Sequence, residues 1–212
     1  LKQHGVDIPW GEKGPFSIDE NMWGRSAEAG VLEDPWNEPP REAYEWTRDA
    51  EDAPATPEYV EIDYEAGMPV RLNGREMGPV ALVEHLNDVG GTHGVGRIDH
   101  VEDRLVGIKS REIYEAPAGV ILHTAHRALE TLTLSKQQIK LKKLIATEYA
   151  ELIYNGLWFS AHHQDIAAYA ASTQRHVSGT VRIKLHRGRA IVAGRKAVQS
   201  LYDRGLATYD RG

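Results

Sequence analysis

Tyr59-Val60-Glu61-Ile62-Asp63-Tyr64 is the stretch that decides the fold class. Large apolar and acidic side chains alternate along it, which is the pattern of a strand with one buried face. Glu65-Ala66-Gly67 predicts a turn into a returning strand at residues 69–72, and Asn73-Gly74 predicts a second tight turn. A similar hairpin is predicted at residues 180–194, around Arg187-Gly188. Strands that pair with their neighbours along the chain favour an antiparallel sheet.

Helical patterns fill much of the remaining chain. They cover residues 79–91, 118–132 and 135–155, with a shorter segment after Ser160. Gly90-Gly91 predicts the end of the first helix, and Ser135 with Gln138 predicts a capping box at the start of the third. Residues 94–108 predict a strand, a turn and a strand. Because helices and strands do not alternate one by one, the predicted class is α+β with a mainly antiparallel sheet.

Residues 27–58 predict a long irregular arm. Five prolines interrupt it, namely Pro35, Pro39, Pro40, Pro54 and Pro57. Each removes a backbone donor and disfavours helix in the preceding residue, so we expect at most a helical turn near residues 42–46. The stretch from Glu28 to Glu58 carries ten acidic residues against two arginines. Trp36, Tyr44 and Trp46 indicate that the arm packs on a surface.

Composition excludes several classes of function. The net charge of −6 comes from the acidic arm, and the rest of the chain lacks the basic cluster that nucleic-acid binding needs. No stretch approaches the ~18 apolar residues of a membrane span. With no cysteine, no signal-peptide pattern and no metal-ligand spacing among its histidines, we expect a cytoplasmic protein without a metal site. Gly94-Val95-Gly96 is an incomplete dinucleotide fingerprint, read as a flexible turn.

Three polar stretches are the candidates for chemistry. They read Phe16-Ser17-Ile18-Asp19-Glu20-Asn21-Met22-Trp23-Gly24-Arg25-Ser26, His93-Gly94-Val95-Gly96-Arg97-Ile98-Asp99-His100-Val101-Glu102 and Gly107-Ile108-Lys109-Ser110-Arg111-Glu112-Ile113-Tyr114-Glu115-Ala116-Pro117. Polar groups placed between apolar strand residues are costly to bury without partners. They therefore either pair with one another or bind a small polar molecule.

These stretches resemble argininosuccinate synthase. The resemblance continues through Tyr149-Ala150-Glu151-Leu152-Ile153-Tyr154-Asn155-Gly156-Leu157-Trp158-Phe159-Ser160 and covers nearly the whole chain from Lys2 onward. In that family an N-terminal domain binds ATP, with Mg, through a pyrophosphate-type loop. The enzyme adenylates the ureido oxygen of citrulline, and the amine of aspartate then displaces AMP to give argininosuccinate. The C-terminal domain is implied to hold citrulline and to build a homotetramer, partly through a helical tail.

The resemblance implies a site and a division of the chain. Ser17, Ser26, Glu102 and Tyr114 match the residues that contact citrulline, while Arg97, Asp99, Lys109 and Arg111 are supporting residues without assigned roles. Residues 1–26 would end the connection to the nucleotide domain and contact citrulline. Residues 27–58 would form the acidic arm, and residues 59–212 the synthetase and multimerisation domain. Asp103 departs from the family's usual asparagine and places a negative charge next to Glu102.

Other interpretations of these residues stay open. Ser17 and Ser26 also fit turn or cap positions, Glu102 fits an ion pair with Arg97 or Arg104, and Tyr114 fits a core aromatic residue. A different class of protein is open too, namely a non-catalytic oligomerisation or interaction module without an ATP-binding half.

The two ends of the chain look cut. Residues 1–5 resemble the last turn of a helix, and the chain ends on polar residues without a closing element. No phosphate-binding loop occurs in the sequence. We therefore expect the chain to hold no ATP and to be inactive without an N-terminal domain.

Overall fold

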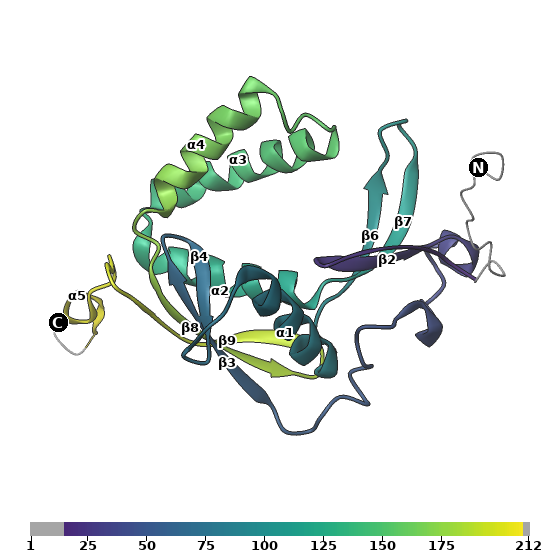
Figure 1. The fold of residues 1–212 in the computed structure, drawn as a ribbon, viewed down its shortest axis with the longest axis horizontal. Coiled ribbons are helices and arrows are strands. Elements are labelled where there is room, and N and C mark those ends of the chain that lie inside the picture. Colours follow the sequence, from purple (N-terminus) through teal and green to yellow (C-terminus); the bar gives the residue numbers. More distant parts are fainter. Residues whose placement is uncertain (1–14, 210–212) are drawn as a thin grey trace.

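A computed structural model describes residues 15–209 of the chain, which fold into helices and two antiparallel sheets (Figure 1). The predicted α+β class is confirmed. The predicted helical turn at residues 1–5 and the polar end at residues 210–212 lie outside the described residues. No helix in the described part of the chain is long and apolar enough to cross a membrane.

The larger sheet carries the hydrophobic core. Its strands lie in the order β5 (Arg75–Glu76), β4 (Met68–Leu72), β3 (Glu58–Glu65), β8 (Gly179–His186) and β9 (Arg189–Ala197). Both predicted hairpins are present, and the alternation along β3 buries Val60, Ile62 and Tyr64 as expected. Helices α1 (Pro79–Thr92) and α2 (Pro117–Thr133) cover this face with Leu82, Leu86, Ile121 and Leu129.

The smaller sheet extends from the side of this core. Its order is β1 (Ser17–Asn21), β2 (Gly24–Glu28), β7 (Lys109–Glu115) and β6 (Arg97–Asp103). The middle pairing brings Ser26 opposite Tyr114 and Arg25 opposite Glu115. Segments from the start and the middle of the chain therefore share one sheet, and the β6–β7 hairpin projects beyond the core (Figure 1).

Two sequence predictions need correction. Helix α1 continues through Gly90 and Gly91 to Thr92. These glycines permit close packing: a Cβ on Gly91 would lie 2.1 Å from the Trp46 carbonyl oxygen, and one on Gly90 would lie 2.8 Å from a side-chain carbon of Pro117. The predicted strand–turn–strand is also shifted, because Gly107 (φ +81°) lies in the turn and the second strand begins at Lys109.

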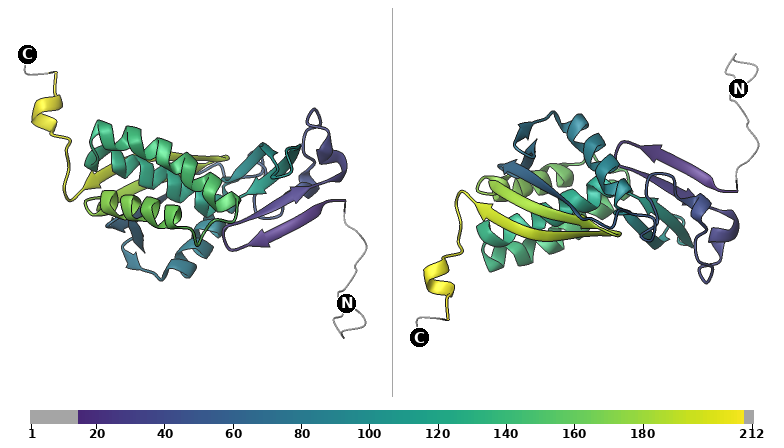
Figure 2. Two further views of the ribbon diagram at one scale, coloured as in Figure 1. Left: turned by 90° about the horizontal axis from the view of Figure 1, so that it is seen from above. Right: turned by 90° about the horizontal axis from the view of Figure 1, so that it is seen from below.

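A helical hairpin stands beside the core. Helix α3 (Lys136–Tyr154) begins at the predicted capping box of Ser135 and Gln138, and α4 (Ala161–Gln174) begins at Ser160, whose hydroxyl caps His163. The two helices lie side by side on one side of the molecule, and the short α5 (Arg204–Ala207) stands away from the body (Figure 2). Few of the hairpin's large apolar side chains are buried, so much of its surface faces outward.

The predicted irregular arm runs from the end of β2 to β3. Within it, short 3₁₀ turns occupy Gly30–Glu33 and Arg41–Ala43. The arm packs on its own chain: Leu32 and Ala43 are buried with Ala27 and Ile113 of the smaller sheet. Trp36, in contrast, is 93% exposed.

Candidate functional site

The smaller sheet brings the four candidate citrulline contacts to one face. Residues directly opposite each other in an antiparallel ladder point to the same side. Asp19, Ser26, Tyr114 and Ile98 form one such row, and Ser17, Glu28, Glu112 and His100 form the next. Glu102 lies opposite Ser110 in the row after that. Ser17, Ser26, Glu102 and Tyr114 therefore all lie on one face, which we call the open face.

The open face has the width of a small ligand. Three inter-strand spacings separate β1 from β6, or about 14 Å. Ser17 is exposed, while Ser26, Glu102 and Tyr114 are partly buried. Within residues 15–209, neither serine hydroxyl has a hydrogen-bond partner. Both hydroxyls are thus available to a ligand, and neither acts as a turn or cap group in the described part of the chain.

Glu102 and Tyr114 each take part in a tyrosine–carboxylate contact. The Tyr114 hydroxyl donates to Glu112, and the hydroxyl of Tyr154 donates to Oε1 of Glu102 at 3.2 Å. Burial and the hydrogen bond to Glu112 raise the pKa of Tyr114. Desolvation and the hydrogen bond to Glu102 raise the pKa of Tyr154. Both phenols therefore remain protonated donors at neutral pH.

The positively charged side chains near Glu102 pair with other groups. Arg104 contacts Glu28, lies 3.7 Å from Glu112, and donates from Nε to the Ser110 hydroxyl at 2.9 Å. Asp103, the neighbour of Glu102, points to the opposite face and pairs with Lys109 at 2.5 Å. An ion pair of Glu102 with Arg97 or Arg104 is therefore not among the contacts of the described residues.

The four candidate supporting residues lie on the opposite face, which we call the arm face. Asp99 and Arg111 form a two-bond pair, with Arg111 Nε at 2.9 Å and Nη2 at 2.6 Å from the carboxylate oxygens. That bond lowers the pKa of Asp99 and raises that of Arg111. Arg111 also donates to the arm carbonyls of Asp34 (3.0 Å) and Asn37 (2.9 Å). These contacts hold the arm, not the open face.

Arg97 holds a later part of the arm. Its guanidinium donates to the Thr47 carbonyl at 2.7 Å, to the Thr47 hydroxyl at 2.8 Å and to Asp49 at 2.6 Å. It also lies 3.7 Å from the centre of the Tyr44 ring. The irregular arm has few backbone partners of its own, and these side-chain bonds satisfy its polar groups.

A separate pocket of about 870 Å³ lies between the β1–β2 turn, the arm and α1. Its lining is acidic, from Glu20, Glu45, Glu84 and Asp88, with Arg48 as a cation. None of the four candidate contacts lines it. Among residues 15–209, no three His, Asp or Glu side chains come together in a way that could hold a metal ion.

Comparison with known proteins gives the family. A family model described as the arginosuccinate synthase C-terminal domain matches residues 16–212. The chain is 58% identical over 208 residues to an argininosuccinate synthase of Dehalococcoides mccartyi, covering 98% of this chain and 51% of that protein. It is 53% identical over 210 residues to that of Symbiobacterium thermophilum, covering 99% and 52%. This chain belongs to the argininosuccinate synthase family.

Another family member, from Listeria monocytogenes, is 54% identical over 208 residues, covering 98% of this chain and 52% of that protein. The chain therefore spans about half the length of the curated argininosuccinate synthases that it matches. The resemblance stated from the sequence is confirmed at the level of the family.

Glu115 and Arg25 have a large structural role in this synthase domain that was missed from the sequence. Glu115 is 1% exposed and accepts hydrogen bonds from the backbone amides of Glu45, Trp46 and Thr47 at 2.8–3.0 Å. It also accepts one from the Thr47 hydroxyl at 2.7 Å and one from the buried Arg25 at 3.2 Å. The sequence of β7 contains a pattern that could have indicated the burial of Glu115. Alternate residues of a strand point to the same face, so Arg111 and Glu115 lie on the same face as the buried Ile113.

Proposed function

We propose that this chain is the citrulline-binding and assembly part of a cytoplasmic argininosuccinate synthase. That enzyme would condense citrulline with aspartate, using ATP bound with Mg by an N-terminal domain, and release AMP and pyrophosphate. The observation that carries the proposal is the placement of Ser17, Ser26, Glu102 and Tyr114 on one face of a single sheet. Family membership supports the reaction.

The open face suits the amino-acid end of citrulline, which carries an ammonium and a carboxylate. The Glu102 carboxylate accepts charge-assisted hydrogen bonds from the ammonium. The hydroxyls of Ser17 and Ser26, which have no hydrogen-bond partner among residues 15–209, donate to the ligand. Tyr114 donates as well, once its hydroxyl turns from Glu112 toward the ligand. None of the four acts as a nucleophile, and their contribution to catalysis is to position the ureido group for attack on ATP.

Assembly is assigned to the helical hairpin. Leu144 of α3 is 65% exposed, and Leu157 and Phe159 of the α3–α4 connection are 51% and 92% exposed. Large apolar side chains exposed on one element suit a surface that a partner covers. The acidic arm, whose aromatic residues predicted that it packs on a surface, packs on its own chain through Ala43 and Tyr44. A homotetramer is proposed on this basis together with the family resemblance.

The Glu102→Gln variant tests the site in the complete synthase that contains this chain. The substitution keeps the shape and removes the charge. A hydrogen bond to a charged group contributes roughly 1.5–3 kcal/mol, so kcat/KM for citrulline should fall about 10- to 150-fold. The KM for ATP should change little. Asp103→Asn is the matched control, because Asp103 points to the other face.

Unchanged citrulline kinetics in Glu102→Gln, together with a lower melting temperature, would show that Glu102 is a structural residue and would refute the proposed citrulline site. Loss of citrulline kinetics in Asp103→Asn to the same degree would also contradict it. A complete protein that assembles normally but neither binds citrulline nor turns over would favour the non-catalytic interaction module.

A further inference from the structure

Tyr154 connects the helical hairpin to the open face. It is the last residue of α3, and its hydroxyl donates to Oε1 of Glu102 at 3.2 Å although the two residues are 52 positions apart in the sequence. Glu102 has no other hydrogen-bonding side chain within residues 15–209. The carboxylate that we assign to the citrulline ammonium is therefore held by a residue from a different structural element.

The end of α3 is built to fix this tyrosine. Gly156 adopts a left-handed conformation (φ +72°), its amide donates to the Ile153 carbonyl at 3.0 Å, and the amide of Leu157 donates to the Leu152 carbonyl at 3.0 Å. These two bonds form the Schellman motif that closes a helix at a defined residue. Leu152 is buried, 3% exposed, and anchors the same turn. The backbone of Tyr154 is thus set by the helix end.

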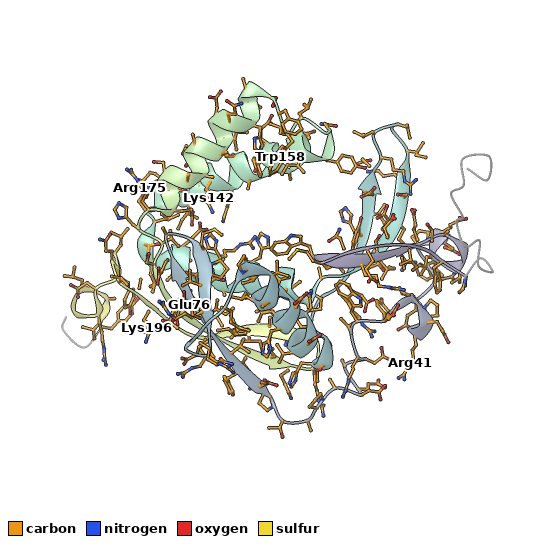
Figure 3. The ribbon with its side chains drawn as sticks, viewed as in Figure 1. Arg41, Glu76, Lys142, Trp158, Arg175 and Lys196 are labelled. Carbon is orange, nitrogen blue, oxygen red and sulfur yellow. The ribbon has the colours of Figure 1, made fainter. Side chains whose placement is uncertain are left out.

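The hairpin is also tied to the core at its other end. Lys142 of α3 contacts Glu130 of α2, and Gln174 of α4 donates to Glu130 at 2.9 Å and accepts, through Oε1, from Nε2 of His126 at 2.8 Å. Figure 3 shows Lys142 on the part of α3 close to α2, and Trp158 toward the opposite end of the hairpin. The hairpin is therefore held by α2 at one end and contacts β6 through Tyr154 at the other.

Charge links the members of this cluster. The negative charges of Glu112 and Glu102 raise the pKa of both Tyr114 and Tyr154, and the positive charge of Arg104 lowers the pKa of Tyr154. Two phenols and two carboxylates thus meet above the open face, with one phenol from the sheet and one from the helix. Glu102 has one hydroxyl donor and keeps an oxygen for another donor such as an ammonium, whereas the second oxygen of Glu112 lies 3.7 Å from Arg104.

We propose that Tyr154 is a positioning residue of the citrulline site, holding the Glu102 carboxylate in place so that the helical hairpin controls the geometry of ligand binding. This inference rests on the proposed function of the open face. A glutamate that is held before the ligand arrives loses less side-chain freedom on binding. Removing the hydroxyl of Tyr154 should therefore weaken citrulline binding and leave the KM for ATP unchanged.

The test compares two substitutions in one helix, in the complete synthase. Tyr154→Phe removes the hydroxyl on Glu102 and keeps the ring. Tyr149→Phe is the control, because the Tyr149 hydroxyl contacts His163 of α4 at 3.0 Å and, within residues 15–209, makes no hydrogen bond to the sheet. We expect the KM for citrulline to rise about 3- to 10-fold in Tyr154→Phe, the range for freeing one rotamer-rich side chain. The kcat and the KM for ATP should stay within about twofold.

Three outcomes decide the matter when Glu102→Gln is measured beside them. A citrulline effect in Tyr154→Phe and none in Tyr149→Phe supports the proposal. Equal effects in both, or none in either while Glu102→Gln is impaired, overturn the role of Tyr154 and leave the proposed function standing. If Glu102→Gln itself leaves citrulline kinetics unchanged, the proposed site fails, and the role of Tyr154 fails with it.

Discussion

Replacing Glu115 by Gln tests how the arm is held. The structure places three donors on Oε1 of Glu115, namely the amides of Trp46 and Thr47 and the Thr47 hydroxyl, at 2.7–3.0 Å. Oε2 receives the Glu45 amide at 2.9 Å and Arg25 at 3.2 Å. Glutamine has a single acceptor oxygen, so in either orientation its NH₂ group faces at least two donors.

The cost follows from the burial of the pair. Glu115 is 1% exposed and Arg25 is 5% exposed, so the substitution removes the buried carboxylate from this guanidinium and leaves it only the exposed carboxylates of Glu20 and Glu45, at 3.8 and 3.4 Å. Removing one partner of a buried ion pair typically costs about 3–5 kcal/mol. Each kcal/mol lowers the Tm of a chain of this size by about 2–4 °C. We therefore expect the Tm to fall by roughly 6–20 °C on these scales.

Thermal unfolding followed by tryptophan fluorescence measures this change, because Trp46 lies in the clamped segment. Glu45→Gln is the matched control. Its carboxylate also faces Arg25, at 3.4 Å, but its side chain is 72% exposed. Exposed ion pairs contribute only about 0–1 kcal/mol. If Glu115→Gln loses no more stability than Glu45→Gln, the arm is held by its apolar contacts, and the claim that the polar contacts of Glu115 hold it is refuted.

Two further predictions concern pH and association. Burial lowers the pKa of His126 below its usual value, so on acidification the unfolded chain takes up this proton first. The free energy of unfolding should fall as the pH drops below about 6.5. His126→Gln should reduce that slope in urea titrations at several pH values, while exposed His123→Gln should not. The chain should also self-associate through the hairpin in light scattering at high micromolar concentration, less so as Leu144→Glu; a wild-type monomer would contradict the assigned surface.

Local signals correctly predicted the two hairpins of the larger sheet and the positions of the helices, except for the end of α1. The alternation along β3, the turn at Asn73 and the capping box at Ser135 each depend on residues a few positions apart, where sequence patterns specify structure. Gly90 and Gly91 were misinterpreted because a glycine pair looks the same whether it ends a helix or lets another segment approach. The approaching atom, the Trp46 carbonyl, belongs to a segment far away in the sequence.

The smaller sheet could not be predicted from such signals. Its central pairing joins β2 to β7, and the bond between Arg25 and Glu115 spans 90 positions. No periodicity within either segment reveals that partner. The candidate contacts Ser17, Ser26, Glu102 and Tyr114 came from family resemblance, and the structure adds that they lie on one face. Their roles toward citrulline stay predictions. Tyr154 was quoted within a matching stretch, but only the fold brings it to Glu102.

The three polar stretches posed a choice between mutual pairing and ligand binding; the structure shows pairing on the arm face, and ligand binding on the open face is our proposal. On the arm face, Arg97, Arg111 and Glu115 bond to backbone groups of residues 34–47, which lack strand partners. On the open face, the hydroxyls of Ser17 and Ser26 bond to nothing among residues 15–209. The same alternation that turns Ser26 and Tyr114 to the open face buries Arg25 and Glu115 beside them. Glu115 and Tyr114 are neighbours in β7, so we expect a loss at Glu115 to reach the open face through the backbone of this strand.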